Sequence, residues 1–170
     1  KNMLEGETQK LRPVDKVNWY VAIAFCNKLS IILGLDPCYT VSGITDWANL
    51  AYDSIPTAID TTWDAVTCDW TKNGYRLPTQ AEWEFAARGG NPDAEEWKYS
   101  YAGVNTKKAP ADFAASPCYD NDLDDYAWYS GTLGGQAATA TTIVTGDPGW
   151  GTHEVGKKKP NTLGLYDMSG

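Results

Sequence analysis

The sequence predicts an α+β domain in which two helices and a few short strands support a large proportion of loop. Residues 18–33 and 79–89 show helical periodicity with recognisable ends, and residues 39–41 alternate as a strand does. After residue 90 the chain is rich in Gly, Pro, Asn, Asp and Thr and has no regular periodicity. The length of 170 residues fits one domain with a sizeable core.

The first helix is predicted to begin after Asn18, whose side-chain oxygen can accept a free backbone N–H of the first turn. Its buried stripe is expected to consist of apolar residues spaced three and four apart, namely Trp19, Ala22, Cys26, Leu29 and Leu33. Gly34 is expected to end the helix in the left-handed conformation, and Pro37 prevents its resumption.

Two short strands are predicted next. Tyr39 and Val41 alternate with polar residues, and Gly43 ends this segment. The stretch WDAVTCDW, residues 63–70, is expected to hold the second strand. It leads into Asn73–Gly74, a dipeptide that favours tight hairpin turns, so a hairpin turn is predicted there.

The second helix is predicted from NGYRLPTQAEWEFAARGG, residues 73–90. Thr79 is placed as its N-cap, and Glu82 three residues later completes a capping box. Pro78 and Trp83 occupy the two positions of a hydrophobic staple. These roles explain most of the local pattern without invoking chemistry.

The rest of the same helix also fits a structural role. One face is formed by Trp83, Ala86 and Ala87. Gly89 is expected to end the helix. Glu82 and Glu84, with arginines nearby, are expected to cap and to form surface pairs rather than to act as a catalytic pair.

Charge and composition exclude several classes of function. The net charge of −8 and the pI of about 4.5 argue against nucleic-acid binding, because phosphates require a basic face. The basic run at 157–159 is expected to be a solvated loop. No apolar run approaches the roughly 20 residues needed to span a bilayer, and no signal peptide is recognised. Eight Trp and ten Tyr suit irregular cores and binding surfaces.

The four cysteines, Cys26, Cys38, Cys68 and Cys118, form no CxxC pattern. Because His153 is the single histidine of the chain, a zinc site is not expected. Cys26 is predicted to be a small core residue. The even number of cysteines allows disulfides without requiring them, and a Cys38–Cys118 bridge remains an alternative to free thiols.

The run Asp120, Asp122, Asp124 begins like an EF-hand calcium loop. Asp125 stands where the loop requires glycine, and Gly131 stands where it requires glutamate, so an EF-hand is excluded. A solvated acidic turn and a looser calcium site are both left open.

No other catalytic signal is found. Tyr126 and Trp128, which follow the acidic run, are expected to pack inward. His153 is expected to be structural, and neither a GxSxG elbow nor a glycine-rich phosphate loop is present. We therefore predict no catalytic, cofactor-binding or metal-binding residue and no cofactor.

The stretch NGYRLPTQAEWEFAARGG strongly resembles the signature of the formylglycine-generating enzyme family, also called sulfatase-modifying-factor-like domains. Three further stretches resemble the family in order and spacing: PVDKVNWYVAIAFCNKLSIILGL, DDYAWYSG and THEVGKKKPNTLGLYDMSG. Together they span residues 13–170. The resemblance implies a C-type-lectin-like fold with two helices, small twisted antiparallel sheets and a large loop content.

The departures from the family pattern affect the expected function. Residues 1–170 resemble a single domain that lacks the family's N-terminal segment and C-terminal third, so further polypeptide is expected to complete the fold. The family's enzymes use a late pair of cysteines that bind copper and act on a substrate cysteine, and no position here matches them. Asp167 lies in a motif whose neighbourhood ligates calcium in family enzymes, but its partners would lie beyond Gly170, so no site is predicted.

Two hypotheses follow from the resemblance. The first is a non-catalytic ligand- or protein-binding module displayed at a bacterial surface, similar to the related variable proteins that retroelements diversify. Its expected partner is a protein or another surface ligand, and its expected location is extracellular or at the cell surface. The alternative is part of a formylglycine-generating oxidase whose catalytic cysteines lie outside this chain. The acidic, loop-dominated composition, rich in Trp and Tyr, favours the first hypothesis.

Overall fold

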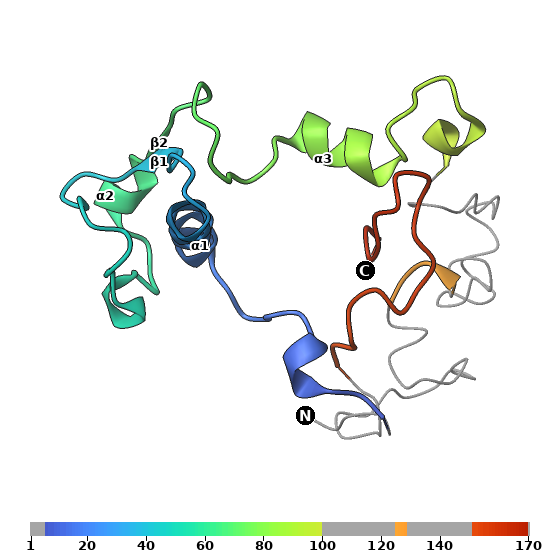
Figure 1. The fold of residues 1–170 in the computed structure, drawn as a ribbon, viewed down its shortest axis with the longest axis horizontal. Helices are drawn as coiled ribbons and strands as arrows, with labels where there is room; N and C mark the ends of the chain where they lie inside the picture. Colours follow the sequence, from blue (N-terminus) through green and yellow to red (C-terminus); the bar gives the residue numbers. More distant parts are fainter. Residues whose placement is uncertain (1–5, 100–124, 129–150, 170) are drawn as a thin grey trace. The chain divides into compact units, whose positions relative to one another are not determined.

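The computed structural model describes residues 6–99, 125–128 and 151–169, and Figure 1 shows its elements. The chain divides into two compact units. One unit is Lys16–Thr79, and the other combines Lys1–Asp15 with Gln80–Gly170. The described residues contain short helices, one two-stranded antiparallel sheet and much loop, which confirms the predicted α+β class.

The unit Lys16–Thr79 is built around α1, Trp19–Ile32. Asn18 caps the helix as predicted, because its Oδ1 accepts a hydrogen bond of 2.9 Å from the backbone N–H of Val21. Gly34 has φ 70°, and the N–H of Leu35 donates to the carbonyl of Ser30 at 2.8 Å. This is the closing bond of a glycine-terminated helix, so the predicted end is also confirmed.

The buried face of α1 differs from the predicted stripe. Its buried residues are Tyr20, Ile23, Ala24, Cys26, Asn27 and Ser30. Cys26 is the one member of the predicted stripe among them, while Trp19 and Leu33 are about half exposed. The predicted stripe was offset from this face, and two members of the face, Asn27 and Ser30, are polar and gave no apolar signal. The side-chain amide of Asn27 is buried but has hydrogen-bond partners. Its Nδ2 donates to Tyr39 O at 2.8 Å, and its Oδ1 accepts from the N–H of Tyr39 at 3.0 Å.

The sheet pairs β1, Tyr39–Thr40, with β2, Thr67–Cys68, and Tyr39 lies opposite Cys68. Both strands occur where the sequence predicted them, and burial alternates at residues 39–41 as expected. The core of the unit combines residues of α1 and of the segment that begins at β1, and it includes Ile23, Val41, Trp47, Ile55 and Trp63. The single turn α2, Thr61–Asp64, begins after Asp60, whose carboxylate accepts from the N–H groups of Thr62 and Trp63.

The predicted hairpin turn at Asn73–Gly74 is wrong, because β2 ends at Cys68 and no strand follows it before α3 begins at Gln80. Asn73 Oδ1 accepts from the backbone N–H of Asp36 at 2.9 Å. A Cβ atom at Gly74 would lie 2.1 Å from the carbonyl oxygen of Asp36. The dipeptide therefore allows two backbone segments to approach closely rather than turning one strand into another.

In the other unit, α3 spans Gln80–Ala87 and begins directly after Thr79, the predicted N-cap. The helix ends as expected, with Gly89 at φ 82° and the N–H of Gly90 donating to Phe85 O at 2.9 Å. Ala87 is buried, but Trp83, the expected aromatic member of the same face, is 49% exposed. The eight-residue helix buries its C-terminal end rather than its middle.

Three short 3₁₀ helices complete the described elements: η1 at Gln9–Leu11, η2 at Tyr52–Ser54 and η3 at Glu95–Lys98. Within the described ranges, none of the helices has the length and apolar character needed to cross a bilayer. The predicted acidic run at 120–124, as well as Cys118 and Gly131, lies outside the described residues.

Candidate functional site

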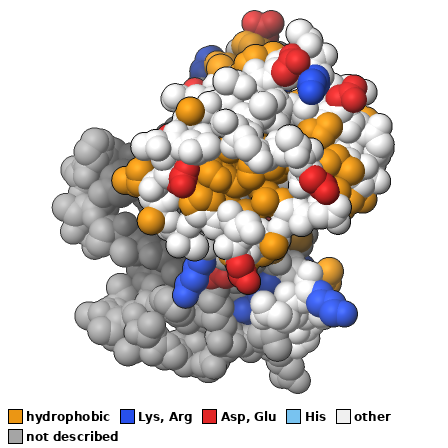
Figure 2. All heavy atoms as spheres, turned by 90° about the vertical axis from the view of Figure 1, so that its left-hand side faces the viewer, with side chains coloured by type: hydrophobic (Ala, Val, Ile, Leu, Met, Phe, Trp, Pro, Cys, Tyr) orange, Lys and Arg blue, Asp and Glu red, His pale blue; other side chains and the backbone are white. Residues whose placement is uncertain are grey.

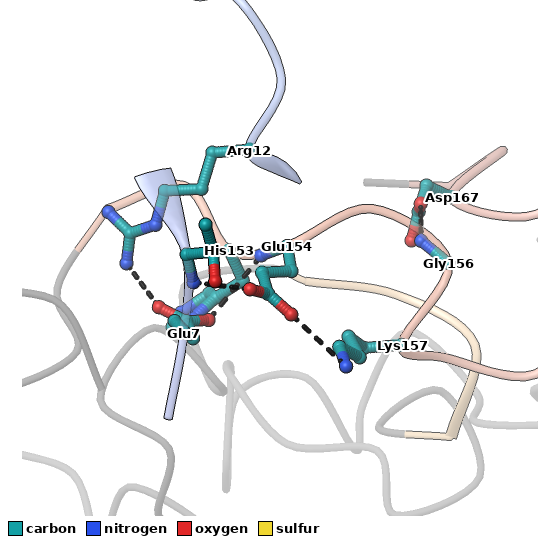
Figure 3. A network of polar contacts seen from close by, with 8 residues as sticks. Glu7, Arg12, His153, Glu154, Gly156, Lys157 and Asp167 are labelled. Atoms are coloured by element: carbon teal, nitrogen blue, oxygen red, sulfur yellow. Dashed lines mark hydrogen bonds and ion pairs between the residues drawn. The ribbon is translucent and has the colours of Figure 1, made fainter. Parts of the chain in front are cut away.

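The densest group of buried charged residues lies in the unit that contains α3, and Figure 3 shows it. The carboxylate of Glu7 lies between two partners. Its Oε2 forms an ion pair with Arg12 Nη2, and its Oε1 lies 2.9 Å from His153 Nδ1. The Arg12 and His153 side chains are 1% and 0% exposed, and that of Glu7 is 10% exposed. The carboxylate of Glu7 therefore forms an ion pair with Arg12 and also contacts a residue 146 positions later.

Glu154 extends the same polar cluster. Its carboxylate accepts from the backbone N–H of Thr8 and pairs with Lys157 Nζ at 3.1 Å (Figure 3). The Thr8 N–H, followed by the Lys157 ammonium, holds the pKa of Glu154 below its ordinary value of 4.5. The backbone N–H of Val155 also donates to Leu11 O at 3.0 Å. Residues 7–12 and 153–157 are thus held together by main-chain and side-chain contacts.

An aromatic stack adjoins this cluster. The Trp128 ring lies 3.9 Å from the His153 ring at an interplanar angle of 23°, and Lys158 Nζ lies 4.0 Å from the Trp128 ring centroid. Lys159 Nζ pairs with Asp125 Oδ2 at 2.6 Å. Lys157 and Lys159 are exposed as predicted and Lys158 is half-buried, but the run is not simply a solvated loop, because each of its lysines has a partner.

The cluster is suited to holding the chain rather than to acid–base chemistry. His153 Nε2 and two nitrogens of Arg12 are buried and have no hydrogen-bond partner within the described part of the chain. A general base must come within hydrogen-bond reach of a substrate proton. The imidazole of His153 has no exposed surface from which to do so. This geometry favours the structural role that the sequence predicted for His153.

A second junction in this unit is made by Asn161, which sequence reasoning missed. Its Nδ2 donates to the carbonyls of Ala86 at 2.8 Å and Ala87 at 3.2 Å, the last two residues of α3. Its Oδ1 accepts from the N–H groups of Leu163 and Leu165. One buried amide therefore binds two carbonyls at the helix C-terminus, of which Ala86 O also accepts from the N–H of Gly89, and shapes the loop that follows Pro160.

Gly89 and Gly90 allow this loop to approach α3 closely. A Cβ atom at Gly89 would lie 2.0 Å from Thr162 Oγ1, and one at Gly90 would lie 2.8 Å from the Leu163 side chain. The GG pair thus serves both to end the helix and to admit the loop. The glycine pair in the sequence indicated that this position needs space or an unusual backbone conformation. The sequence pattern could not identify the residue that approaches Gly89, which is Thr162, 73 positions away.

Asp167, which lies near the end of the chain, has a left-handed backbone with φ 56°. Its Oδ2 accepts from the N–H of Gly156 at 2.8 Å (Figure 3), and its Oδ1 is buried without a partner among the described residues. Over the described ranges, no three His, Cys, Asp or Glu side chains are grouped so that they could hold a metal ion. Asp167 therefore has no set of metal ligands around it in the described chain.

The described cysteines are free thiols rather than parts of a reactive site. Cys26, Cys38 and Cys68 are unbonded to one another, and Cys38 Sγ donates to Gly74 O at 3.2 Å. Burial raises the pKa of the Cys26 and Cys68 thiols. A thiol with a raised pKa is a poor nucleophile, because the thiolate is the reactive form. The predicted alternative of a Cys38–Cys118 bridge involves a residue outside the described chain.

The carboxylates of α3 behave as surface groups. Glu84 Oε1 pairs with Arg88 Nε at 3.0 Å across one helical turn. Arg88 Nη1 also donates to the carbonyls of Trp97 at 2.6 Å and Tyr99 at 3.0 Å, which fastens η3 to the helix. The prediction that Glu84 forms a surface pair is confirmed.

Comparison with known proteins relates this chain to a family of longer polypeptides. A chain titled Treponema denticola variable protein 1 has 42% sequence identity and a TM-score of 0.70, over 98% of this chain and 49% of that one. The crystal structure of CarF has 31% identity and a TM-score of 0.57, over 94% and 47%. Chaperone protein LppX from Paenibacillus barcinonensis is 36% identical over 167 residues, 94% of this chain and 49% of that protein.

The chain thus spans about half the length of the relatives it matches. The likeness to the variable protein agrees with the C-type-lectin-like fold expected from the sequence, with few helices, a small antiparallel sheet and much loop. The model of the sulfatase-modifying factor enzyme 1-like domain matches residues 2–170. The chain therefore belongs to the sulfatase-modifying factor enzyme 1-like domain family, as its four sequence stretches indicated.

Proposed function

We propose that this chain is part of a non-catalytic binding domain, displayed at a bacterial surface, that recognises a protein or another surface ligand. The observation that carries the proposal is the 42% identity and common fold with Treponema denticola variable protein 1 over 98% of the chain. A relative that is named a chaperone protein adds support, because its name implies contact with polypeptides. We further propose that residues 1–170 belong to a single domain. We also propose that the sequence of its ligand site is varied by a retroelement, as expected for relatives of the variable proteins.

The described residues support binding more than catalysis. The imidazole of His153 is buried, and burial raises the pKa of two thiols. Loop segments are held in place by side chains such as Asn161, which binds the end of α3, and Glu7, which binds Arg12 and His153. Irregular loops on a fixed scaffold are a common basis for ligand recognition.

A second function is supported by the family itself, whose description names a sulfatase-modifying enzyme. In that case the chain is part of a formylglycine-generating oxidase, with the copper-binding cysteines elsewhere in the polypeptide. The two functions predict opposite results in one assay.

The test uses the whole protein that contains this chain. It is incubated with a cysteine peptide of the sulfatase type, copper and oxygen, and formylglycine is measured by mass spectrometry. We expect none above background. In parallel, intact cells are treated with an impermeant protease or an antibody, and we expect the protein to be accessible. Formylglycine production would establish the oxidase, and protection on intact cells would rule out surface display.

A further inference from the structure

The surface of the unit Lys16–Thr79 has an unusual charge distribution. Residues 29–71 contain six aspartates and no lysine, arginine, histidine or glutamate. None of these aspartates forms an ion pair with another described residue. Figure 2 looks onto the side of the molecule where α2 lies and shows an apolar area with separate carboxylates around it. This side therefore combines apolar contact area with carboxylates that form no ion pair, although the charges of Lys28 and Lys72, at the two ends of this stretch, act on Asp46 and Asp69.

Within this surface, residues 51–64, which we term the display segment, alternate between anchors and exposed side chains. Ile55 and Trp63 are 6% and 5% exposed and belong to the core beneath α1. Tyr52 and Ile59 are 68% and 90% exposed. An isolated exposed apolar residue is ordinary. Here Ile59 lies between the two anchors and Tyr52 lies three residues before the first of them, so two large exposed side chains belong to one anchored segment and form a presented surface.

Polar contacts fix the display segment to α1. The amide of Asn18 donates to Pro56 O at 2.8 Å, and the backbone N–H of Asp60 donates to Tyr20 Oη at 3.1 Å. Asp60 also caps α2. Because the backbone is fixed in this way, little conformational entropy remains to be lost when Tyr52 and Ile59 meet a partner.

We propose that the display segment is the contact surface for a protein partner that places lysine or arginine side chains around an apolar recess. Tyr52 and Ile59 fill the recess, and the aspartates of residues 29–71 face the basic rim. Asp53 and Asp64 lie in the segment and are exposed. Complementary charge then sets the choice of partner and the rate of association, while the apolar pair supplies most of the affinity. This inference rests on the proposed binding function.

The test uses the whole protein and three fluorescent 12-residue probe peptides, made of alternating Lys and Leu, Glu and Leu, or Lys and Ser. Anisotropy gives each Kd. We expect the Lys/Leu peptide to bind at least about tenfold more tightly than the other two, because it alone offers both chemistries. The Y52S/I59S variant should lose about tenfold in affinity for it. D53N should lose about two- to fivefold, with the difference diminishing at 0.5 M salt.

Two matched controls locate the effect. V14S/V155S removes two exposed apolar side chains from the other unit, and D93N removes one exposed carboxylate there. Both should change Kd less than twofold. Thermal melts of all variants show whether each remains folded, and substitutions at exposed positions should leave the melting temperature nearly unchanged.

Several outcomes would overturn the inference. If Y52S/I59S binds the Lys/Leu peptide with the same Kd as the wild type, the display segment is not the contact surface. Binding would then come from the general negative charge of the protein. If the Glu/Leu peptide binds with the same Kd as the Lys/Leu peptide, the aspartates do not select a basic partner. Self-association in sedimentation that Y52S/I59S abolishes would identify a second copy as the occupant. None of these results bears on surface accessibility or oxidase activity, so the proposed function can stand or fail separately.

Discussion

The Oε1 atom of Glu7 lies 2.9 Å from Nδ1 of His153, and the two residues are separated by 146 positions in the sequence. The same carboxylate pairs with Arg12, whose side chain is 1% exposed. Glu7 is thus one of the links between the beginning of the chain and the segment that carries the basic run. Its removal would leave both a cation and an imidazole buried without their shared acceptor.

We expect Glu7→Ala to lower the free energy of unfolding by about 3–5 kcal/mol, because it leaves the guanidinium of Arg12 buried without its charged partner. Replacing both residues, as in Glu7→Leu with Arg12→Met, should recover much of that loss. Urea denaturation of the whole protein measures both changes. The control is Glu95→Ala, which breaks the exposed Glu95–Lys98 pair and should cost less than about 1 kcal/mol. Equal effects of Glu7→Ala and Glu95→Ala would contradict the buried ion pair.

The pKa of Glu154 predicts a specific pH dependence. Hydrogen bonds from Thr8 N and Lys157 lower the pKa of this carboxyl below 4.5 in the folded state, so ionisation favours folding. The stabilisation is fully present above pH 4.5 and is lost as the pH falls through the lower folded-state pKa. Melting temperature measured from pH 7 to pH 3 should therefore fall more steeply for the wild type than for Glu154→Gln. Parallel curves below pH 4.5 would show that Glu154 has no linked proton.

The sequence predicted the features that depend on neighbouring residues. The Asn18 cap reaches Val21, three residues away, and the glycine ends of α1 and α3 are set by their own backbone conformations. The alternation of Tyr39 and Val41 likewise follows from the period of a strand. Each signal and its physical cause lie within a few residues of each other.

The features that the sequence did not predict depend on contacts between distant residues. Asn27 belongs to the buried face of α1 because Tyr39 satisfies its amide, and no periodicity of apolar residues can show that. The Glu7–His153 contact and the attachment of Asn161 to α3 span 146 and 75 positions. Asn73–Gly74 carried a hairpin signal, but the close approach of Asp36 determined its actual use. At the candidate site, the sequence indicated a structural role for His153 but not the residues around it.

We expect Asn161→Ala to lower the free energy of unfolding by about 2–4 kcal/mol, because it leaves the carbonyl of Ala87 and the N–H groups of Leu163 and Leu165 without partners. Asn161→Asp retains the acceptors for Leu163 and Leu165 but puts a negative charge against the C-terminus of α3. It should therefore be no better tolerated than alanine. Chemical denaturation measures both, with Asn49→Ala at an exposed asparagine as the control. A small effect of Asn161→Ala would contradict its role at the helix end.

Two tryptophans of the same chain should respond differently to removal. Trp63 is 5% exposed and packs edge-on against Trp47 with ring centroids 5.9 Å apart, so Trp63→Ala should cost about 3–5 kcal/mol. Trp83 on α3 is 49% exposed, so Trp83→Ala should lower the free energy of unfolding by distinctly less, about 1–2 kcal/mol. Thr79→Ala, one residue before α3, should cost about 1 kcal/mol if Thr79 caps the helix.

Urea denaturation of the three variants in the whole protein gives their order. Trp63→Ala should lower the free energy of unfolding most, because of the three substitutions it alone opens a cavity in the core of its unit. If Trp83→Ala equals or exceeds it, Trp83 must be covered in the whole protein by polypeptide that buries α3. In that case Phe85→Ala, at another exposed aromatic residue of the same helix, should show a comparable loss. A loss at Trp83 without one at Phe85 would instead confine the contact to a single side chain.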